Sequence, residues 1–396
     1  MNNNDTFCIL PWVHTHVKPN GDVHLCSRKS IPLGNLREQP IVDIFYSDKM
    51  DSIRSRMLNG KKVEGCEKCY HVEEVSEVSL RKSMNLWFYE YLINDNITLR
   101  KDDVIHDGTD YSMYGWIELF KNRKPKIEWL ALHASNVCNL ACRGCYSLLS
   151  SKWKKDEISL GINPYPLHNQ DLHTFGIDFN AVNFITMYGG EPLIMKQNEQ
   201  LMDYLIHCNN INKRILQYYT NAMQMPSNKT LDVWKKIRKL ELLLSIDGYK
   251  ELNDYFRSGS NWAIIEQNIH SYVRYSKEYN WILKTMTVIS IYNVKHLNKL
   301  HNWLKGIGFS DNCITYNLCV VPPELDIRNL PQEYKDSISN YYKTVDLPDN
   351  IKDLVLTHLM SEPNISFIAA SAFSKKLDKL RGQENPALEL QKYIDN

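Results

Sequence analysis

Three closely spaced cysteines constrain this chain more than any other feature of its sequence. Cys138, Cys142 and Cys145 follow a C-x3-C-x2-C spacing in the segment WLALHASNVCNLACRGCYSLLSSKW. An apolar run precedes them and a polar run follows, so we expect them to lie in a loop. Iron–sulfur clusters are held by cysteine thiolates and normally take four of them. Three thiolates at this spacing therefore predict a cluster in which one iron has no protein ligand.

The bulk composition excludes several classes of protein. With 396 residues, the chain is long enough for two domains. Its 47 lysines and arginines nearly balance 46 aspartates and glutamates, so the net charge indicates neither nucleic acid nor a membrane surface as partner. No apolar run is long enough to span a bilayer, and the start MNNNDTF lacks the features of a signal peptide. We expect a cytoplasmic protein.

The ten cysteines indicate metal binding rather than disulfides, because the cytosol keeps thiols reduced. Seven of them form two groups, which are Cys8, Cys26, Cys66 and Cys69, and then Cys138, Cys142 and Cys145. The remaining three, Cys208, Cys313 and Cys319, stand singly in apolar surroundings. A free cysteine of that kind is more often a small buried hydrophobe than a reactive group.

The first seventy residues predict a second site with four thiolates. The alternating segments WVHTHV and VHLC flank the turn PNGD, which predicts a hairpin that brings Cys8 and Cys26 together. A helix is expected from Ile41 to Leu58, and it leads to the Cys66-x2-Cys69 pair. Four thiolates suit either an iron–sulfur cluster or structural zinc, and the spacing alone favours neither.

Four histidines lie near these cysteines and are alternative ligands. They are His14, His16, His24 and His71. Histidines on a strand near a surface are more often solvated than ligating, so we expect them to be exposed to solvent. From Val72 to about Ile93 the pattern predicts one long helix with an aromatic packing stripe.

After a polar linker at 96–126, the chain alternates strands with helices. The expected strands are Ile127–Ala134, Val182–Tyr188, Arg214–Thr220, Glu241–Ile246, Trp281–Ser290 and Ile314–Val321. The expected helices are Glu199–Cys208, Leu231–Leu240, Trp262–Tyr279 and His296–Lys305. This order predicts an α/β fold with parallel strands, either a doubly wound sheet or an incomplete barrel, with ligands at the carboxyl ends of the strands.

The motifs at these strand ends resemble those of a known family. The segment CNLACRGC resembles the radical S-adenosylmethionine (SAM) signature, and Gly189-Gly190-Glu191-Pro192 is similar to that family's GGEP motif. Thr220-Asn221 and SIDG at 245–248 also stand at the expected strand ends. The resemblance covers Ile127 to about Val321 and implies a partial (β/α)6 TIM-like barrel at 127–321.

The N-terminal region resembles the auxiliary-cluster domains called SPASM or twitch. The residues that carry this resemblance are Cys8, Pro11-Trp12, Gly21, Cys26, Gly34-Asn35, Cys66 and Cys69. Such domains usually follow the barrel, whereas this one precedes it, as in twitch-containing radical SAM proteins. The resemblance implies a small N-terminal α+β iron–sulfur domain at 1–95 and favours an auxiliary [4Fe-4S] cluster over zinc. A C-terminal helical extension is expected at 322–396.

The resemblance also implies a cofactor and roles for individual residues. The open iron would chelate S-adenosyl-L-methionine, whose reductive cleavage gives a 5′-deoxyadenosyl radical that abstracts hydrogen from carbon. The residues expected to contact SAM are Gly144, Gly189, Gly190, Glu191, Asn221, Ser245 and Arg257. The family commonly has an aromatic residue where this chain has Gly144. Asp247 is as suited to holding the following turn as to binding ligand, and a surface ion pair is the alternative for Arg257.

The implied function is hydrogen abstraction from a peptide or small-molecule substrate, possibly a sugar. Oxidation, epimerisation or crosslinking would follow, with the auxiliary cluster as electron relay and a flavodoxin- or ferredoxin-type protein as electron donor. Cys319, near the end of the last strand, is the candidate hydrogen-atom donor of an epimerase. The alternative from another class is a zinc-stabilised, non-catalytic binding protein on a degenerate barrel.

Overall fold

The computed structural model describes residues 6–28, 31–75, 79–94, 123–165 and 170–395. The chain forms two compact units. Unit 1 comprises residues 1–134, 168–186 and 207–210, and unit 2 comprises residues 135–167, 187–206 and 211–396. Most of the expected linker at 96–126 lies outside the described residues, so the domain boundaries set from the sequence stay predictions.

Unit 1 is built on the predicted hairpin. Strand β1 (His14–Val17) pairs antiparallel with β2 (Asp22–His24), which pairs with β3 (Gly34–Asn35). On its other side β1 pairs in parallel with β4 (Trp129–Leu132), so β1 is an inner strand. Gly21 has a φ of +86° in the turn, a conformation that glycine adopts at little cost. The hairpin predicted from PNGD is therefore confirmed.

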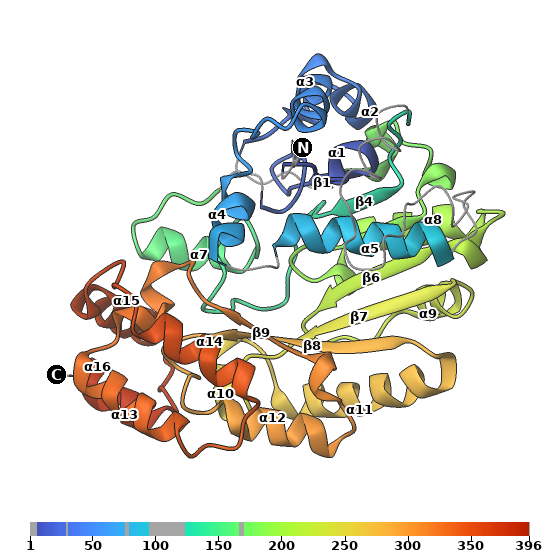
Figure 1. The fold of residues 1–396 in the computed structure, drawn as a ribbon. Coiled ribbons are helices and arrows are strands. Elements are labelled where there is room, and N and C mark those ends of the chain that lie inside the picture. The colour runs from blue at the N-terminus through green and yellow to red at the C-terminus, as the bar shows by residue number, and fades with distance from the viewer. Residues whose placement is uncertain (1–5, 29–30, 76–78, 95–122, 166–169, 396) are drawn as a thin grey trace. The chain divides into compact units, whose positions relative to one another are not determined.

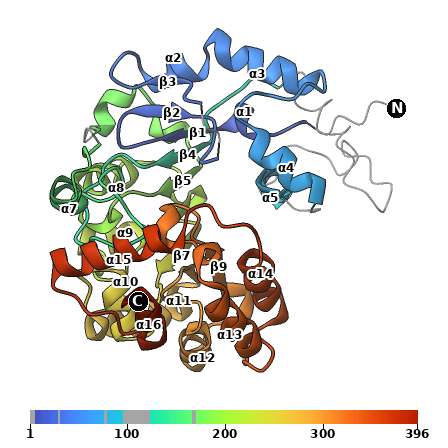
Figure 2. The same cartoon turned by 90° about the vertical axis from the view of Figure 1, so that its left-hand side faces the viewer.

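One short helix precedes the hairpin and four helices follow it among the described residues of unit 1. They are α1 (Leu10–Val13), α2 (Ile41–Phe45), α3 (Asp48–Leu58), α4 (Glu67–Val75) and α5 (Leu80–Asn94), with 3-10 turns η2 (Leu172–Phe175) and η3 (Phe179–Ala181). The expected helix over 41–58 is two helices, because the Ser47 side chain accepts a hydrogen bond from Met50 N and starts a new one. The expected helix from Val72 is likewise divided between α4 and α5. Figure 2 shows α2 and α3 beside the hairpin strands.

An aromatic cluster forms the core of unit 1 beside α5. The Trp87 ring lies 5.2 Å from the ring centroid of Trp129 and 4.8 Å from that of Phe184. Trp129 and Phe184 stack at 4.6 Å, and the Trp129 indole N–H donates to Thr186 Oγ1. Such ring pairs add to the stabilisation from burial alone. The predicted aromatic stripe is thus a packing face.

Unit 2 carries four parallel strands whose spatial order follows the chain. They are β6 (Ile215–Thr220), β7 (Lys239–Ser245), β8 (Ile282–Ile289) and β9 (Ile314–Leu318), each paired in parallel with the next. Strand β5 (Phe184–Met187) ends at the first residue of this unit. A doubly wound sheet reverses its strand order at a switch point, and no reversal occurs from β6 to β9. The α/β fold with a partial barrel is confirmed.

Helices connect these strands as crossovers (Figure 1). They are α7 (Trp153–Ser159), α8 (Lys196–Ile206), α9 (Asn228–Trp234), α10 (Glu251–Phe256), α11 (Trp262–Tyr279) and α12 (Leu297–Gly306). The expected helix Leu231–Leu240 was wrong at its end, because Lys239 and Leu240 already belong to β7. Short 3-10 turns are η4 (Pro192–Ile194), η5 (Ile211–Lys213), η6 (Asp311–Cys313), η7 (Pro323–Leu325) and η8 (Ile327–Asn329).

The C-terminal extension is helical, as predicted. It contains α13 (Gln332–Tyr342), α14 (Asp349–Leu359), α15 (Phe367–Arg381) and α16 (Leu388–Asp395). These helices gather on one side of unit 2 in both views (Figures 1 and 2). No helix among the described residues is long and apolar enough to cross a membrane.

Candidate iron–sulfur and SAM sites

The three cysteines of the motif lie together in unit 2. Cys138 and Cys142 are buried and pack with Leu140, while Cys145 and Met223 border the same cluster. The Cys145 thiol hydrogen-bonds to Cys142 and lowers the pKa of Cys142 to about 7. Burial, together with the charge of Cys142, raises the pKa of Cys138 to about 12. The loop thus brings three sulfur donors into one partly desolvated place.

Backbone hydrogen bonds from a distant segment hold the cysteine loop. Ala141 N donates to the carbonyl of Ser258 at 2.8 Å, and Arg143 N donates to that of Phe256 at 2.7 Å. The Trp153 indole N–H donates to the carbonyl of Cys142 at 2.7 Å. Buried backbone groups need such partners, so these bonds fix the course of the loop between the cysteines.

The GGEP segment runs directly against the cysteine loop. Glu191 N donates to the carbonyl of Val137 at 2.9 Å. A side chain at Gly190 would overlap that same carbonyl, and one at Gly189, whose φ is +149°, would overlap Met195. The sequence suggested that these glycines admit the ligand. The structure gives a second reason for them, which is the close approach of two backbone segments.

Glu191 is fully buried and accepts three hydrogen bonds. Its carboxylate accepts from Thr220 Oγ1 at 2.8 Å, from Asn221 N at 2.7 Å and from Leu193 N at 3.2 Å. Burial raises its pKa, and these bonds oppose that shift. Glu191 therefore ties the GGEP segment to the end of β6. Its predicted contact with the SAM ammonium group stays a prediction.

The predicted polar groups at the strand ends lie in the same unit. The side-chain amide of Asn221, just after β6, donates to Asn139 Oδ1 in the cysteine loop at 2.8 Å. Ser245 is the last residue of β7 and is partly exposed. The ligand contacts expected of Asn221 and Ser245 are not tested, but both side chains remain candidates.

Arg257 forms a buried ion pair, so the alternative of a surface ion pair was wrong, while its expected contact with SAM stays a prediction. Its Nη1 lies 2.6 Å from Asp247 Oδ2, with side-chain exposures of 12% and 2%. Asp247 also accepts from Val288 N at 2.7 Å, so it holds the strand end of β8. Burial alone lowers the pKa of Arg257, but the charges of Cys142 and Asp247 outweigh it and hold that pKa above its ordinary value. Arg257 thus places positive charge near the cysteines.

Gly144 has a neighbour that the sequence did not predict, whereas Cys319 is buried, as expected of a single cysteine in apolar surroundings. A Cβ at Gly144 would lie 3.3 Å from the Phe256 ring, so an aromatic ring from α10 borders the position where the family commonly has one. Cys319 is only 3% exposed, and its thiol donates toward the carbonyl of Val321 at 3.6 Å. Burial raises the pKa of Cys319 to about 12. Its role as hydrogen-atom donor stays a prediction.

The four-cysteine site lies in unit 1. One pocket is lined by all four cysteines, Cys8, Cys26, Cys66 and Cys69, together with Tyr70 and Arg81. Burial, followed by the charges of Cys26 and Cys66, raises the pKa of Cys8 well above its ordinary value. The Arg81 Nη1 donates to the carbonyl of Phe7, next to Cys8, at 2.7 Å. The hairpin and the C-x2-C pair therefore meet as expected.

The histidines near this site are mostly buried, so the expectation that they are solvated was wrong for three of the four. His14, His16 and His24 are 2–6% exposed, whereas His71 is exposed. His14 Nδ1 lies 2.7 Å from the carbonyl of Leu25. Burial lowers the pKa of His14 to about 4. His14 and His16 lie on β1 between β2 and β4, and His24 lies on β2 between β1 and β3, so none of the three is on an edge strand.

Residues 8–70, which include all four cysteines of unit 1, match the family model named SPASM, described as an iron–sulfur cluster-binding domain. A comparison with curated proteins found no match. Among solved structures, the chain is similar to anSMEcpe with bound AdoMet and a Cp18Cys peptide, at 17% identity and a TM-score of 0.36, covering 59% of this chain and 62% of the other. It is also similar to SuiB of Streptococcus suis bound to S-adenosylmethionine, at 14% identity and a TM-score of 0.36, covering 69% and 59%. The chain spans about six-tenths of these solved chains.

Residues 8–70 therefore match an iron–sulfur cluster-binding domain, which precedes the parallel strands β6 to β9 in the sequence. This match confirms the predicted resemblance of the N-terminal region to the SPASM auxiliary-cluster domains. An auxiliary iron–sulfur cluster, rather than structural zinc, is accordingly the group that Cys8, Cys26, Cys66 and Cys69 suit.

Proposed function

We propose that this chain is a radical SAM enzyme. It would cleave S-adenosyl-L-methionine reductively at a [4Fe-4S] cluster held by Cys138, Cys142 and Cys145 and abstract hydrogen from a substrate carbon. The observation that carries the proposal is the gathering of three thiols, and not four, in one loop against the GGEP segment. A cluster normally takes four ligands, so one iron would remain open to a substrate or cofactor.

The residues around the loop suit the cofactor chemically. The three thiols are soft donors, which iron–sulfur clusters require. Arg257 carries a buried Nε that has no hydrogen-bond partner within the described residues. A carboxylate, such as that of the methionine end of SAM, would satisfy this donor. Bound there, the cluster and SAM together supply one-electron reduction and radical chemistry, which protein side chains cannot.

The chain's own residues would position the cofactor and exclude water. Glu191 and the two glycines before it hold the loop against the end of β6, so the sulfur ligands keep their places. Uncharged contacts to the cofactor would come from Asn221 and Ser245, at the ends of β6 and β7, and from Gly144 in the cysteine loop. Arg257, fixed by Asp247, offsets negative charge near Cys142. Preorganised groups of this kind need no rearrangement during the reaction.

Unit 1 would serve as an electron relay. Four cysteines line one pocket there, and a cluster with four thiolate ligands has no open iron. Such a cluster would instead transfer an electron to or from a substrate radical or the other cluster. A flavodoxin- or ferredoxin-type protein is the expected donor for the first reduction.

The substrate is proposed to be a peptide or a small molecule such as a sugar. One of the solved structures similar to this chain contains a peptide. Oxidation, epimerisation and crosslinking are the possible outcomes, and epimerisation would need a hydrogen-atom donor such as Cys319. In that case Cys319→Ala keeps SAM cleavage and loses the epimerised product, while unchanged product excludes the role.

Anaerobic reconstitution with iron and sulfide tests the proposal. The wild-type protein should bind two clusters, and the triple variant of Cys138, Cys142 and Cys145 to Ala should lose about half of the iron. Reduced protein should form 5′-deoxyadenosine from SAM with substrate present. Stoichiometric zinc with no iron would instead establish the zinc-stabilised binding protein. If both clusters are bound but no 5′-deoxyadenosine forms, the radical SAM reaction is contradicted and the iron–sulfur sites are not.

A further inference from the structure

A fully buried arginine stands inside the three-cysteine loop. Arg143 lies between Cys142 and Cys145, and its side chain is 0% exposed. Burying a guanidinium is costly unless it is paired and hydrogen-bonded. Such a residue between two cluster ligands therefore calls for a structural partner, and the partner comes from the C-terminal extension.

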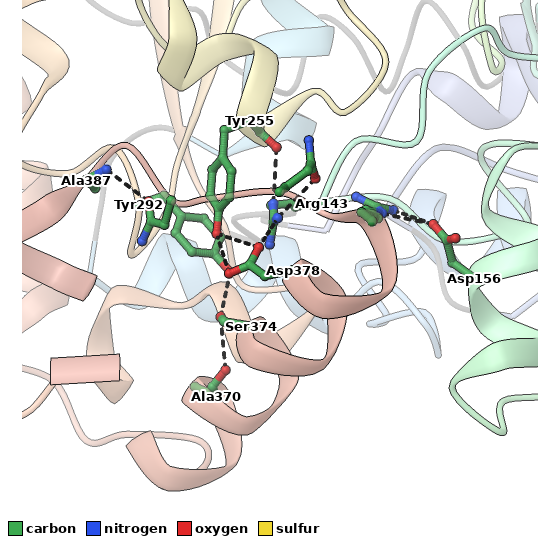
Figure 3. Close-up of polar contacts among 11 residues, drawn as sticks. Arg143, Asp156, Tyr255, Tyr292, Ala370, Ser374, Asp378 and Ala387 are labelled. Atoms are coloured by element: carbon green, nitrogen blue, oxygen red, sulfur yellow. Dashed lines mark hydrogen bonds and ion pairs between the residues drawn. The ribbon is translucent and has the colours of Figure 1, made fainter. Parts of the chain in front are cut away.

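The partner is Asp378 on α15, as Figure 3 shows. Arg143 Nη2 forms an ion pair with the Asp378 carboxylate and donates to Gln383 Oε1 at 3.1 Å. The guanidinium also lies 3.7 Å from the ring centroid of Tyr255, whose hydroxyl donates to Asp378 at 3.0 Å. Arginine, carboxylate and aromatic ring thus form one buried network.

A second contact joins α15 to the same cysteine loop. Arg381 lies 4.6 Å from the ring centroid of Trp153 and forms an ion pair with Asp156 at 2.7 Å. Trp153 in turn donates to the carbonyl of Cys142. Asp378 and Arg381 are one helical turn apart on α15. Asp378 binds Arg143, the residue after Cys142, and Arg381 packs on Trp153, which donates to the Cys142 carbonyl. Arg143 also has an Nη1 without a hydrogen-bond partner in the described part of the chain.

We propose that α15 is a positioning element of the three-cysteine site, and that the Arg143–Asp378 pair sets the reduction potential of the cluster held there. The inference rests on the proposed function. A reduced cluster carries one more negative charge than an oxidised one, so nearby positive charge favours reduction. Buried charges act strongly because water does not screen them, and charge and hydrogen bonding are known determinants of cluster potentials. Asp378 offsets the positive charge of Arg143.

The variant Asp378→Asn tests this in the full-length, reconstituted protein. Its reduction potential is measured by a redox titration followed by electron paramagnetic resonance, using the signal that changes when SAM is added. Because Asn leaves the Arg143 charge uncompensated, the cluster should become easier to reduce. We expect the ratio of reduced to oxidised cluster at a fixed potential to rise at least about tenfold, a shift of about 59 mV for one electron.

Two further variants separate charge from packing. The double variant Arg143→Gln/Asp378→Asn has no charge at this pair, so its potential should return toward the wild-type value. A network that merely stabilised the fold would leave the double variant at least as altered as the single one. Glu389→Gln is the matched control, because it breaks an ion pair between α16 and Lys295 that does not contact the loop. It should leave the potential unchanged.

The outcomes are distinguishable. A wild-type protein that binds no cluster at the three cysteines contradicts the proposed function. A loaded Asp378→Asn protein with the wild-type potential, or a double variant that keeps the shift of the single one, overturns the present inference. Should Asp378→Asn bind no iron, Tyr255→Phe is titrated instead. It removes only a hydroxyl that donates to Asp378, and we expect a smaller shift toward harder reduction. No shift in that variant also overturns the inference.

Discussion

The two cysteine sites of this chain are built in opposite ways. The four cysteines of unit 1 all come from residues 8–69. Cys8 and Cys26 flank the β1–β2 hairpin, and Cys66 and Cys69 stand at the start of α4. The three cysteines of unit 2 come from a single loop, whose backbone is held by the carbonyls of Phe256 and Ser258 and whose Arg143 side chain is held by α15. One site is assembled from local sequence, and the other depends on segments more than a hundred positions away.

The two sites also differ in the charged residues around their cysteines. In unit 1, Arg28, Lys68 and Arg81 line the cysteine pocket, and the first two are exposed to solvent. In unit 2 Arg143, Arg257 and Arg381 surround the cysteine loop, each paired with an aspartate. Four thiolates would complete a cluster, whereas three would leave one iron open to a further ligand. Under the proposed function, a controlled electrostatic environment is therefore needed more at the three-cysteine site.

The largest expected effect comes from removing one ligand at each site. Cys142→Ala should lower 5′-deoxyadenosine formation by roughly a thousandfold or more, because an essential catalytic unit is lost. Cys66→Ala should leave this cleavage measurable and abolish substrate turnover, since the auxiliary cluster serves only the relay. Chromatographic quantification of 5′-deoxyadenosine and of product distinguishes the two. Equal losses of cleavage would show that the sites are not separable.

The next effect concerns the buried ion pair beside the three-cysteine loop. Asp247→Asn leaves Arg257 buried without its counter-charge and removes a hydrogen bond to Val288 N. Breaking a buried pair by removing one partner costs about 3–5 kcal/mol, which urea denaturation would measure as a lower free energy of unfolding. Asp349→Asn, which breaks an exposed pair with Lys352, should cost less than about 0.5 kcal/mol. Similar costs for both would contradict the importance of burial.

A smaller effect is expected from the close approach of two backbones. In Gly190→Ala the new methyl group would overlap the Val137 carbonyl, and overpacking of this kind costs about 1–3 kcal/mol. Gly306→Ala is the matched control, because nothing lies within 4 Å of a Cβ there and alanine favours the end of helix α12 by up to about 1 kcal/mol. Thermal denaturation of both variants measures the contrast. A stabilised Gly190→Ala protein would be inconsistent with the structure.

The smallest effect is a pH dependence that belongs to unit 1. Burial lowers the pKa of His14 to about 4, whereas the unfolded chain binds this proton near pH 6.5. Stability from the neutral His14 is therefore complete above pH 6.5 and is lost as the pH falls toward 4. At pH 5 the loss is about 2 kcal/mol. The variant His14→Gln cannot titrate there, so its free energy of unfolding should fall less between pH 7 and pH 5. An equal fall in the free energy of unfolding of the two proteins between pH 7 and pH 5 would show that His14 is not the titrating group.

Local signals predicted most of the fold. The hairpin follows from alternating residues around Asn20-Gly21, and all six strands from β4 to β9 overlap the apolar runs that predicted them. The break at Ser47 between α2 and α3 could have been predicted from the sequence, because serine is a common N-cap. The burial of His14 could not, since it depends on the pairing of β1 with a strand more than a hundred positions later.

The same limit applies to the candidate site. The cysteines, the glycines and Glu191 stand in motifs that a reader of the sequence can recognise. Arg143 stands in the motif too, but its partner Asp378 lies 235 positions away in a helix without any distinctive pattern. Phe256, which borders Gly144, likewise lies more than a hundred positions from the motif in sequence. Contacts between segments so far apart are set by tertiary packing, which residue spacing does not encode.

The separation of Arg143 from Asp378 also has a consequence during synthesis. Ribosomes add about 5–20 residues per second, so 235 residues take on the order of 10–50 s. Throughout that interval the cysteine loop lacks the helix that holds it, whereas all four cysteines of unit 1 have been synthesised once the chain reaches residue 69. The contacts from α15 that hold the three-cysteine loop therefore form long after the loop's own residues have been made.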